Sequence, residues 1–220
     1  KDIIERNHLQ NEEGLEEIFR VLASSMGSAV NPTKIANTFM SEAKIKISSN
    51  TIKKYIEHLK DAFLVSEALQ YNIKGRKYIG ADSKFYFEDP GVRNAILGFR
   101  QVEFSHLMEN VLYNELCARG YTVDVGRIET YEKNKSGKTE RKVLEVDYVV
   151  NRGSQRVYIQ SAYMLPDEAK ITQEIRPFKY IGDGFRKVII SGDYMRGFYD
   201  NDGIFRIGIY NFLTDPYCLE

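Results

Sequence analysis

Two neighbouring segments give the strongest fold signal in the chain: Leu144-Glu145-Val146-Asp147-Tyr148-Val149-Val150 and Tyr158-Ile159-Gln160-Ser161-Ala162-Tyr163. Both are strand-like. Because alternate side chains of a strand share a face, Glu145 and Asp147 are predicted to point the same way. The intervening Asn151-Arg152-Gly153-Ser154 is short and rich in turn-forming residues. The second segment is therefore predicted to return antiparallel to the first.

The composition is that of a globular protein whose charges cancel. The 220 residues include 31 basic and 31 acidic side chains, so no overall field favours nucleic acid and any such case rests on local charge. Cys117 and Cys218 are too few for a disulfide framework and lack zinc-site spacing, which indicates a reducing cytoplasm. No apolar run is long enough for membrane insertion, and the start lacks a signal peptide's apolar core. Because it also lacks a methionine, we expect a fragment of a longer protein.

Three helices and a hairpin are predicted for residues 1–98. Apolar residues at helical spacing predict a first helix over 15–26, ended by Gly27. Asn31-Pro32 opens a second helix, and Ser48-Ser49-Asn50-Thr51 caps a third that continues to residue 63. Strand-like residues flank the turn Lys74-Gly75-Arg76-Lys77. The order helix, helix, helix, hairpin is typical of a winged helix-turn-helix.

This predicted domain has an excess of basic residues. Residues 31–84 contain ten lysines and arginines, Lys84 among them, against five acidic side chains, a local net charge of plus five. In helix-turn-helix docking, the N-terminal residues of the recognition helix enter the major groove and a wing reaches phosphates. The predicted nucleic-acid-binding residues are Ser49, Asn50, Lys53, Lys54, Lys74, Arg76 and Lys77.

Two other interpretations of these residues stay open. Lysines on an outer helix face are commonly only solvated, and winged helices also dock proteins. The predicted recognition helix contains no arginine, the residue best suited to bidentate contacts with guanine. Phosphate contact is therefore favoured over sequence-specific readout.

An α/β sandwich is predicted for residues 99–220. A helix ends at Gly120 and a strand follows at 121–125. Next come a charged loop at 133–142 and the two strand-like segments quoted above. A helix over 166–180, a strand at 188–190 and a late strand at 204–210 complete the pattern. The order helix, three strands, helix, strand implies the sandwich.

Several motifs together give the chain a family resemblance. They are Lys1-Asp2-Ile3-Ile4, the helix at Thr51-Ile52, Lys84-Phe85-Tyr86-Phe87-Glu88-Asp89-Pro90-Gly91-Val92, Met108-Glu109-Asn110-Val111-Leu112-Tyr113-Asn114-Glu115-Leu116, Arg119-Gly120-Tyr121 and Glu145-Val146-Asp147-Tyr148-Val149-Val150. Over nearly its whole length the chain resembles the C-terminal region of a large group of prokaryotic AAA-type ATPases. The resemblance implies a P-loop ATPase domain, then a winged helix, then a domain of unknown function similar to the restriction-endonuclease, or PD-(D/E)xK, fold. No G-x-x-x-x-G-K-[ST] motif occurs in these 220 residues, so ATP is expected only in an ATPase domain outside them.

The resemblance also implies a nuclease-like site that has lost part of its chemistry. In active members, a helix glutamate, a strand aspartate and an acid two residues before a lysine gather around magnesium. Glu109 and Asp147 match the first two positions and are the predicted metal ligands, whereas Gln160 and Ala162 occupy the other two. A neutral amide removes a ligand charge, and loss of the lysine removes an electrostatic contribution to catalysis. We expect slow or absent hydrolysis, no required cofactor, and magnesium only if the site is active.

The leading hypothesis is a non-catalytic recognition module of an ATPase that binds DNA or a protein partner. One alternative is a metal-dependent nuclease with a rearranged site, using a lysine from elsewhere such as Lys142 or Lys187. Another alternative is a module that binds only protein. If the site is inactive, Glu109 is expected on a helix surface or cap, and Asp147 is expected to be a buried structural acid.

Overall fold

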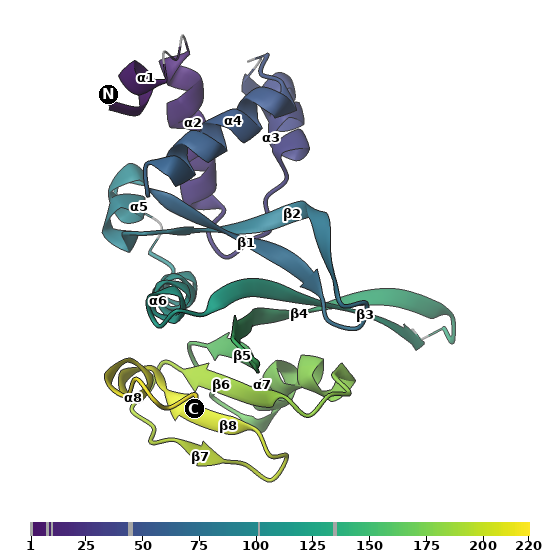
Figure 1. Cartoon of the computed structure of the whole chain (residues 1–220). Helices are drawn as coiled ribbons and strands as arrows, with labels where there is room; N and C mark the ends of the chain where they lie inside the picture. The colour runs from purple at the N-terminus through teal and green to yellow at the C-terminus, as the bar shows by residue number, and fades with distance from the viewer. Residues whose placement is uncertain (1, 8, 10, 44–45, 101, 134–135) are drawn as a thin grey trace. The chain divides into compact units, whose positions relative to one another are not determined.

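The computed structural model describes residues 2–7, 9, 11–43, 46–100, 102–133 and 136–220 (Figure 1). It has two compact units, Lys1–Ala68 with Ala81–Asn110, and Leu69–Gly80 with Val111–Glu220. The chain therefore passes between the units inside the β1/β2 hairpin and again inside helix α6 (Phe104–Ala118). Helices and a large mixed sheet are both present, which confirms a mixed α+β fold. The division into domains at residue 98 stays a prediction.

Three capped helices form most of the first unit. They are α2 (Glu12–Ser24), α3 (Pro32–Thr38) and α4 (Ser49–Asp61). The Asn31 side chain accepts a hydrogen bond from the Thr33 N–H at 2.8 Å, and Ser48 Oγ accepts one from the Thr51 N–H at 3.1 Å. Both predicted caps are confirmed, because each side chain satisfies a backbone donor that the helix leaves without a partner.

Shorter elements complete the first unit. They are α1 (Asp2–Arg6), the π-helical turn η1 (Phe39–Ala43) and α5 (Pro90–Ile96). The start of β1 (Val65–Asn72) and the end of β2 (Lys77–Phe87), both away from the hairpin tip, also belong to this unit. Backbone hydrogen bonds in both directions join Val30 and Ser83 at 2.7 and 3.1 Å, and so tie the α2–α3 connection to β2. The helices of this unit therefore pack against the adjacent ends of β1 and β2.

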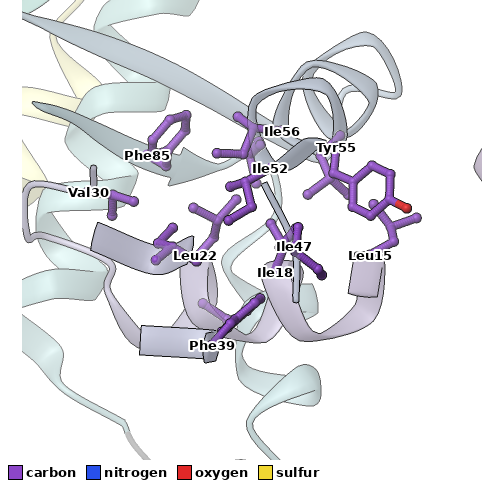
Figure 2. Packing of buried hydrophobic residues seen from close by; sticks show 14 of the residues in the cluster. Leu15, Ile18, Leu22, Val30, Phe39, Ile47, Ile52, Tyr55, Ile56 and Phe85 are labelled. Atoms are coloured by element: carbon purple, nitrogen blue, oxygen red, sulfur yellow. The ribbon is translucent and has the colours of Figure 1, made fainter. Parts of the chain in front are cut away.

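The core of the first unit comes from helical periodicity. Leu15, Ile18 and Leu22 of α2 meet Ile52 and Ile56 of α4 (Figure 2). These positions recur every three or four residues, so each helix presents one apolar face inward. The opposite face of α4 is left to solvent, and that is the face expected to meet DNA.

One mixed sheet runs through the described residues in the order β2-β1-β3-β4-β5-β6-β8-β7. In the second unit its strands are β3 (Thr122–Lys133), β4 (Thr139–Arg152), β5 (Gln155–Ala162), β6 (Arg186–Ser191), β7 (Phe198–Tyr199) and β8 (Phe205–Gly208). β4 and β5 pair antiparallel, as predicted, whereas β5–β6 and β6–β8 pair in parallel. Gly153, at φ 60°, supplies the left-handed residue in the β4–β5 turn.

The helices of the second unit cover this sheet. They are α7 (Glu168–Ile175), the 3-10 helix η2 (Arg176–Tyr180) and α8 (Ile209–Thr214), in addition to the C-terminal part of α6. Ile175 and Phe178 pack with Val149, Tyr158 and Ile189 in the apolar core. No helix among the described residues is long and apolar enough to cross a bilayer.

Two predictions for the second unit are wrong in detail. The charged stretch at 133–142, predicted as a loop, is strand at both ends: Lys133 closes β3 and 139–142 open β4, where Lys142 and Arg141 form ion pairs with Glu132 and Glu129 of β3. Residues 136–138 form the turn, and 134–135 lie outside the described residues. The late strand predicted at 204–210 ends at Gly208, and α8 starts at Ile209. Alternating apolar residues at 205–208 gave no sign of where the helix would begin.

Candidate functional site

The exposed face of α4 contains four of the predicted nucleic-acid-binding residues. Asn50, Lys53 and Lys54 are exposed, and Ser49 is half-buried. The apolar positions of this helix, from Ile52 to Leu59, are buried in the core. Helical geometry therefore forces the two lysines outward near the N-terminus of the helix. Two exposed ammonium groups and an amide on one face suit contact with phosphates.

The other three predicted residues, Lys74, Arg76 and Lys77, lie in the second unit. They are exposed at the tip of the β1/β2 hairpin. Residues 70–72 of β1 pair in parallel with β3, so the tip belongs to the large sheet. The Lys74 ammonium lies 5.4 Å from the centre of the Tyr180 ring and 3.5 Å from the Glu129 carbonyl. The seven predicted residues are thus divided between the two units.

Lys84 does not contribute to a basic surface, which corrects its place among the ten basic residues. Only 2% of its surface is exposed, and its ammonium lies 3.0 Å from Glu109 Oε1. Alternation along β2 places Lys84 and Tyr86 on the same face, and the Tyr86 hydroxyl donates to the same carboxylate oxygen at 2.7 Å. A buried lysine in this position needs an anionic partner, which Glu109 supplies.

Glu109 is therefore a buried member of the first unit's core, and its predicted place on a helix surface or cap is wrong. Asn110, the next residue of α6, also bonds to β2. The Asn110 side chain accepts from the Phe87 N–H and donates to the Phe87 carbonyl, both at 2.7 Å. Together these contacts fix the helix against the strand. Glu109 has the geometry of a structural ion pair.

Asp147 of β4 and Gln160 of β5 lie side by side in the second unit, and the side chain of each accepts a hydrogen bond from a backbone N–H of the other strand. Opposite Val125 of β3, β4 has two residues, Asp147 and Tyr148, which forms a β-bulge. The Asp147 N–H donates to Gln160 Oε1 at 2.8 Å, and the Ser161 N–H donates to Asp147 Oδ2 at 2.7 Å. Asp147 is half-buried and Gln160 is buried. These bonds join β4 to β5 next to Tyr148 and Ile159, the end pair of their antiparallel ladder.

A carboxylate and a lysine of α7 extend this cluster. Gln160 Nε2 donates to Glu174 Oε2 at 3.3 Å, and the Lys170 ammonium lies 2.6 Å from Glu174 Oε1. We call Asp147, Gln160, Glu174 and Lys170 the α7 cluster. The sequence offered one sign of it, an acid four residues after a lysine on a predicted helix, but nothing local relates that pair to Gln160.

The lysines considered as replacements have other partners. Lys142 lies 2.9 Å from Glu132 Oε2, and the Lys187 ammonium donates to the Asp183 carbonyl at 3.3 Å. Ala162, where the predicted nuclease-like site would have a lysine, is 3% exposed and packs in the apolar core of the second unit. That environment would disfavour an ammonium group.

The donors present do not fit a magnesium site. Magnesium prefers several hard oxygen ligands in octahedral array. In the α7 cluster the Gln160 oxygen and one Asp147 oxygen already accept backbone N–H groups. Within the described parts of the chain, no group of three or more histidine, cysteine, aspartate or glutamate side chains is placed to hold a metal ion.

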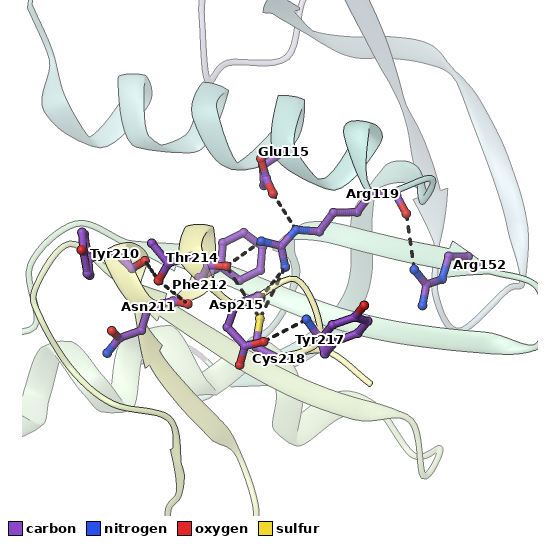
Figure 3. A network of polar contacts seen from close by, with 10 residues as sticks. All are labelled: Glu115, Arg119, Arg152, Tyr210, Asn211, Phe212, Thr214, Asp215, Tyr217 and Cys218. Carbon is purple, nitrogen blue, oxygen red and sulfur yellow. Dashed lines mark hydrogen bonds and ion pairs between the residues drawn. The ribbon is translucent and has the colours of Figure 1, made fainter.

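Arg119 anchors the end of the chain to α6 (Figure 3). Its guanidinium donates to Glu115 Oε1 at 2.7 Å and to the carbonyls of Phe212 and Asp215 at 2.6 and 3.1 Å. It also lies 4.3 Å from the centre of the Phe212 ring. Carbonyls at the end of α8 lack intrahelical partners, and an arginine satisfies them. This arginine is structural.

Comparisons with known proteins give relatives without an assigned activity. A family model described as a domain of unknown function (DUF8612) matches residues 1–103. An uncharacterized protein of Haemophilus influenzae is 32% identical over 88% of this chain and 44% of its own length. Uncharacterized protein MJ1544 of Methanocaldococcus jannaschii is 27% identical over 81% of this chain and 37% of its own length. The chain thus spans less than half the length of these relatives.

Among solved structures, protein VC1899 from Vibrio cholerae aligns over 92% of this chain and 50% of its own, at 15% identity and a TM-score of 0.30. A similarity this low assigns neither a fold nor an activity.

Proposed function

We propose that this chain is a non-catalytic recognition module that contacts DNA phosphates through the exposed face of α4. The observation that supports it best is the outward placement of Asn50, Lys53 and Lys54 near a capped helix N-terminus. The helix macrodipole adds partial positive charge at that end, which favours phosphate oxygens. Such contact requires neither a metal nor another cofactor.

The order of elements in the first unit agrees with a winged helix-turn-helix in this role. α3 and α4 would be the helix-turn-helix pair, with α4 as the recognition helix, and the β1/β2 hairpin would be the wing. The β3–β5 strands with α6 and α7 agree with a nuclease-like frame in the second half. In this proposal that frame supports recognition, because the position of its lysine is Ala162 in an apolar core.

Titration of the 220-residue chain with a labelled duplex would test the proposal. We expect a dissociation constant of about 1–100 µM that weakens steeply with salt, since each phosphate contact releases counterions. Replacing Lys53 and Lys54 together by alanine should weaken binding and lower the salt slope by about two. Fluorescence anisotropy at several salt concentrations measures both quantities.

The control is Lys179→Ala, which removes an exposed lysine of the second unit. It should leave the salt slope unchanged. Arg76→Ala then reports whether the hairpin tip takes part. Absence of binding at low salt, or equal binding by the Lys53→Ala/Lys54→Ala variant, would contradict the DNA proposal. A partner protein captured through the same face would then become the better assignment.

The nuclease alternative has one observation in its favour, the carboxylate and lysine that α7 places beside Gln160. Incubation with plasmid and magnesium or manganese tests it, with Asp147→Ala and Lys170→Ala as paired variants. We expect no cleavage by any of them. Cleavage lost in both variants would establish the rearranged site and overturn the non-catalytic assignment, whereas equal cleavage by Asp147→Ala would indicate contamination.

We further propose that the module is attached to a P-loop ATPase domain, as the family resemblance implies. The support is indirect, because more than half of each relative lies outside the matched region. We expect a G-x-x-x-x-G-K-[ST] motif in those outer parts. If neither relative contains one, this assignment fails while the DNA proposal still stands.

A further inference from the structure

The second unit contains a pocket of about 400 Å³ that the proposed DNA contact does not use. Its wall includes Tyr71, Arg76, Asn151, Arg156, Asp183 and Phe185. The volume falls within the range of pockets that hold small organic ligands. Two arginines, an acid and exposed aromatic surface in one concave site give it a definite chemical preference.

Arg156 is held in this pocket without a carboxylate partner. Its Nε donates to Asn151 Oδ1 at 2.7 Å and its Nη1 donates to the Tyr71 hydroxyl at 3.4 Å. Its guanidinium lies 5.0 Å from the centre of the Tyr71 ring and 5.6 Å from that of Phe185. In the described residues, no carboxylate oxygen lies within ion-pair distance of it.

The nearby acids are engaged elsewhere. The field of Asp124 reaches Arg156, but its carboxylate accepts from the Tyr78 hydroxyl at 3.1 Å. The two oxygens of Asp183 accept from the Tyr158 hydroxyl at 2.7 Å and from the Phe185 N–H at 3.2 Å. A half-buried arginine whose contacts are neutral groups and rings retains its charge for an anionic ligand.

Arg76 adds a second cation at the mouth of the same pocket. It is exposed, and within the described parts of the chain its guanidinium has no hydrogen bond or ion pair. Its φ of 50° is uncommon for a non-glycine residue. The hairpin therefore holds an arginine in a left-handed turn position where glycine would be less strained. Its side chain lines the same pocket as that of Arg156.

The other walls exclude a bare phosphate as the best-fitting ligand. Asp183 would repel a compact anion, but its oxygens can also accept from amino or hydroxyl groups of a ligand. Phe185 is 41% exposed, so its ring presents apolar surface against which a planar group can pack. The fitting ligand has an anion at one end and a planar ring with donors at the other.

We propose that this pocket binds a nucleotide, with the phosphate at Arg76 and Arg156 and the base near Phe185 and Asp183. The nucleotide is either free or the 5′-phosphorylated end of a nucleic-acid strand. Both present the same phosphate and ring chemistry. Its residues belong to the second unit and α4 belongs to the first, so different variants test the two proposals.

Calorimetric titration of the whole chain tests this assignment. The probes are adenosine monophosphate, adenosine, inorganic phosphate, and a single-stranded 12-mer with or without a 5′-phosphate. We expect saturable binding of the monophosphate, and at least tenfold weaker binding of adenosine and of inorganic phosphate. Arg76→Ala and Arg156→Lys should each weaken binding of the monophosphate by about tenfold, because the first removes a cation and the second replaces a planar, bidentate guanidinium by an ammonium group.

Lys179→Ala and the Lys53→Ala/Lys54→Ala variant should leave monophosphate binding unchanged, and thermal melting confirms that every variant is folded. Preference for the 5′-phosphorylated strand over the monophosphate identifies a strand end as the ligand, and the reverse identifies a free nucleotide. Equal binding of inorganic phosphate overturns the nucleotide assignment. So does an absence of saturable binding by every probe, or binding that neither arginine variant weakens.

Discussion

The two units differ in how deeply several of their charged side chains are buried and in what these contact. In the first unit, Lys84 and Glu109 form an ion pair inside the core, with the Tyr86 hydroxyl on the same carboxylate. In the second unit, Asp147 is half-buried at a β-bulge and Glu132 is joined to cations at the surface. The predicted nuclease-like site would give Glu109 and Asp147 one shared task. Their surroundings assign them two structural ones.

Because both carboxylates have structural contacts, their presence supports the fold without implying an activity. In Glu109, one buried carboxylate oxygen accepts from both a lysine and a tyrosine of its own unit. Asp147 is half-buried, and its carboxylate stabilises its own unit by accepting a backbone N–H. Both residues would be kept for stability even if no metal ever bound. The contrast can be tested by removing each charge in turn.

The largest effect is expected from Glu109→Gln. This change leaves the Lys84 ammonium, 2% exposed, beside a neutral amide. Breaking a buried pair in this way costs about 3–5 kcal/mol of unfolding free energy. Urea denaturation followed by circular dichroism measures the loss.

The double variant Lys84→Met/Glu109→Gln is the matched control. It removes both charges and keeps an acceptor for the Tyr86 hydroxyl, so most of the lost stability should return. If Glu109→Gln alone lies within about 1 kcal/mol of the original protein, the pair is not held in the core and Glu109 becomes available for other chemistry.

A smaller loss is expected from Asp147→Ala. The Ser161 N–H would lose a charged acceptor at 2.7 Å, a contact worth about 1.5–3 kcal/mol. Asp147→Asn keeps an oxygen in place and should lose less. Hydrogen exchange at the Ser161 amide, together with urea denaturation, measures the effect. A gain in stability from Asp147→Ala would contradict the structural role, because residues kept for function at a cost behave that way.

Local sequence signals predicted the elements of the first unit well. Apolar residues at three- and four-residue spacing predicted α2 and α4, and Asn31 and Ser48 predicted the caps of α3 and α4, because these signals act within one turn of helix. The antiparallel β4–β5 pair followed from alternation and a glycine-containing turn.

Non-local contacts explain what the sequence did not reveal. Lys84 resembles any surface lysine until Glu109, 25 residues later, is brought against it. Lys170 and Glu174 resemble an ordinary helix pair until β5 places Gln160 beside them. The parallel pairing of β1 with β3, which draws the hairpin tip into the second unit, joins residues such as Gln70 and Val125 that no local pattern relates.

The smallest effect is expected at the surface, from Glu132→Gln. Lys142, Arg176 and Tyr180 hydrogen-bond to Glu132 and lower its pKa from 4.5 to about 2. Because the folded-state pKa is depressed, the stabilisation is fully present above pH 4.5 and is lost as pH falls through about 2. The melting temperatures of the original protein and the variant should therefore differ slightly at neutral pH and converge toward pH 2. A difference that disappears already between pH 5 and 4 would mean that these cations do not hold Glu132 in solution.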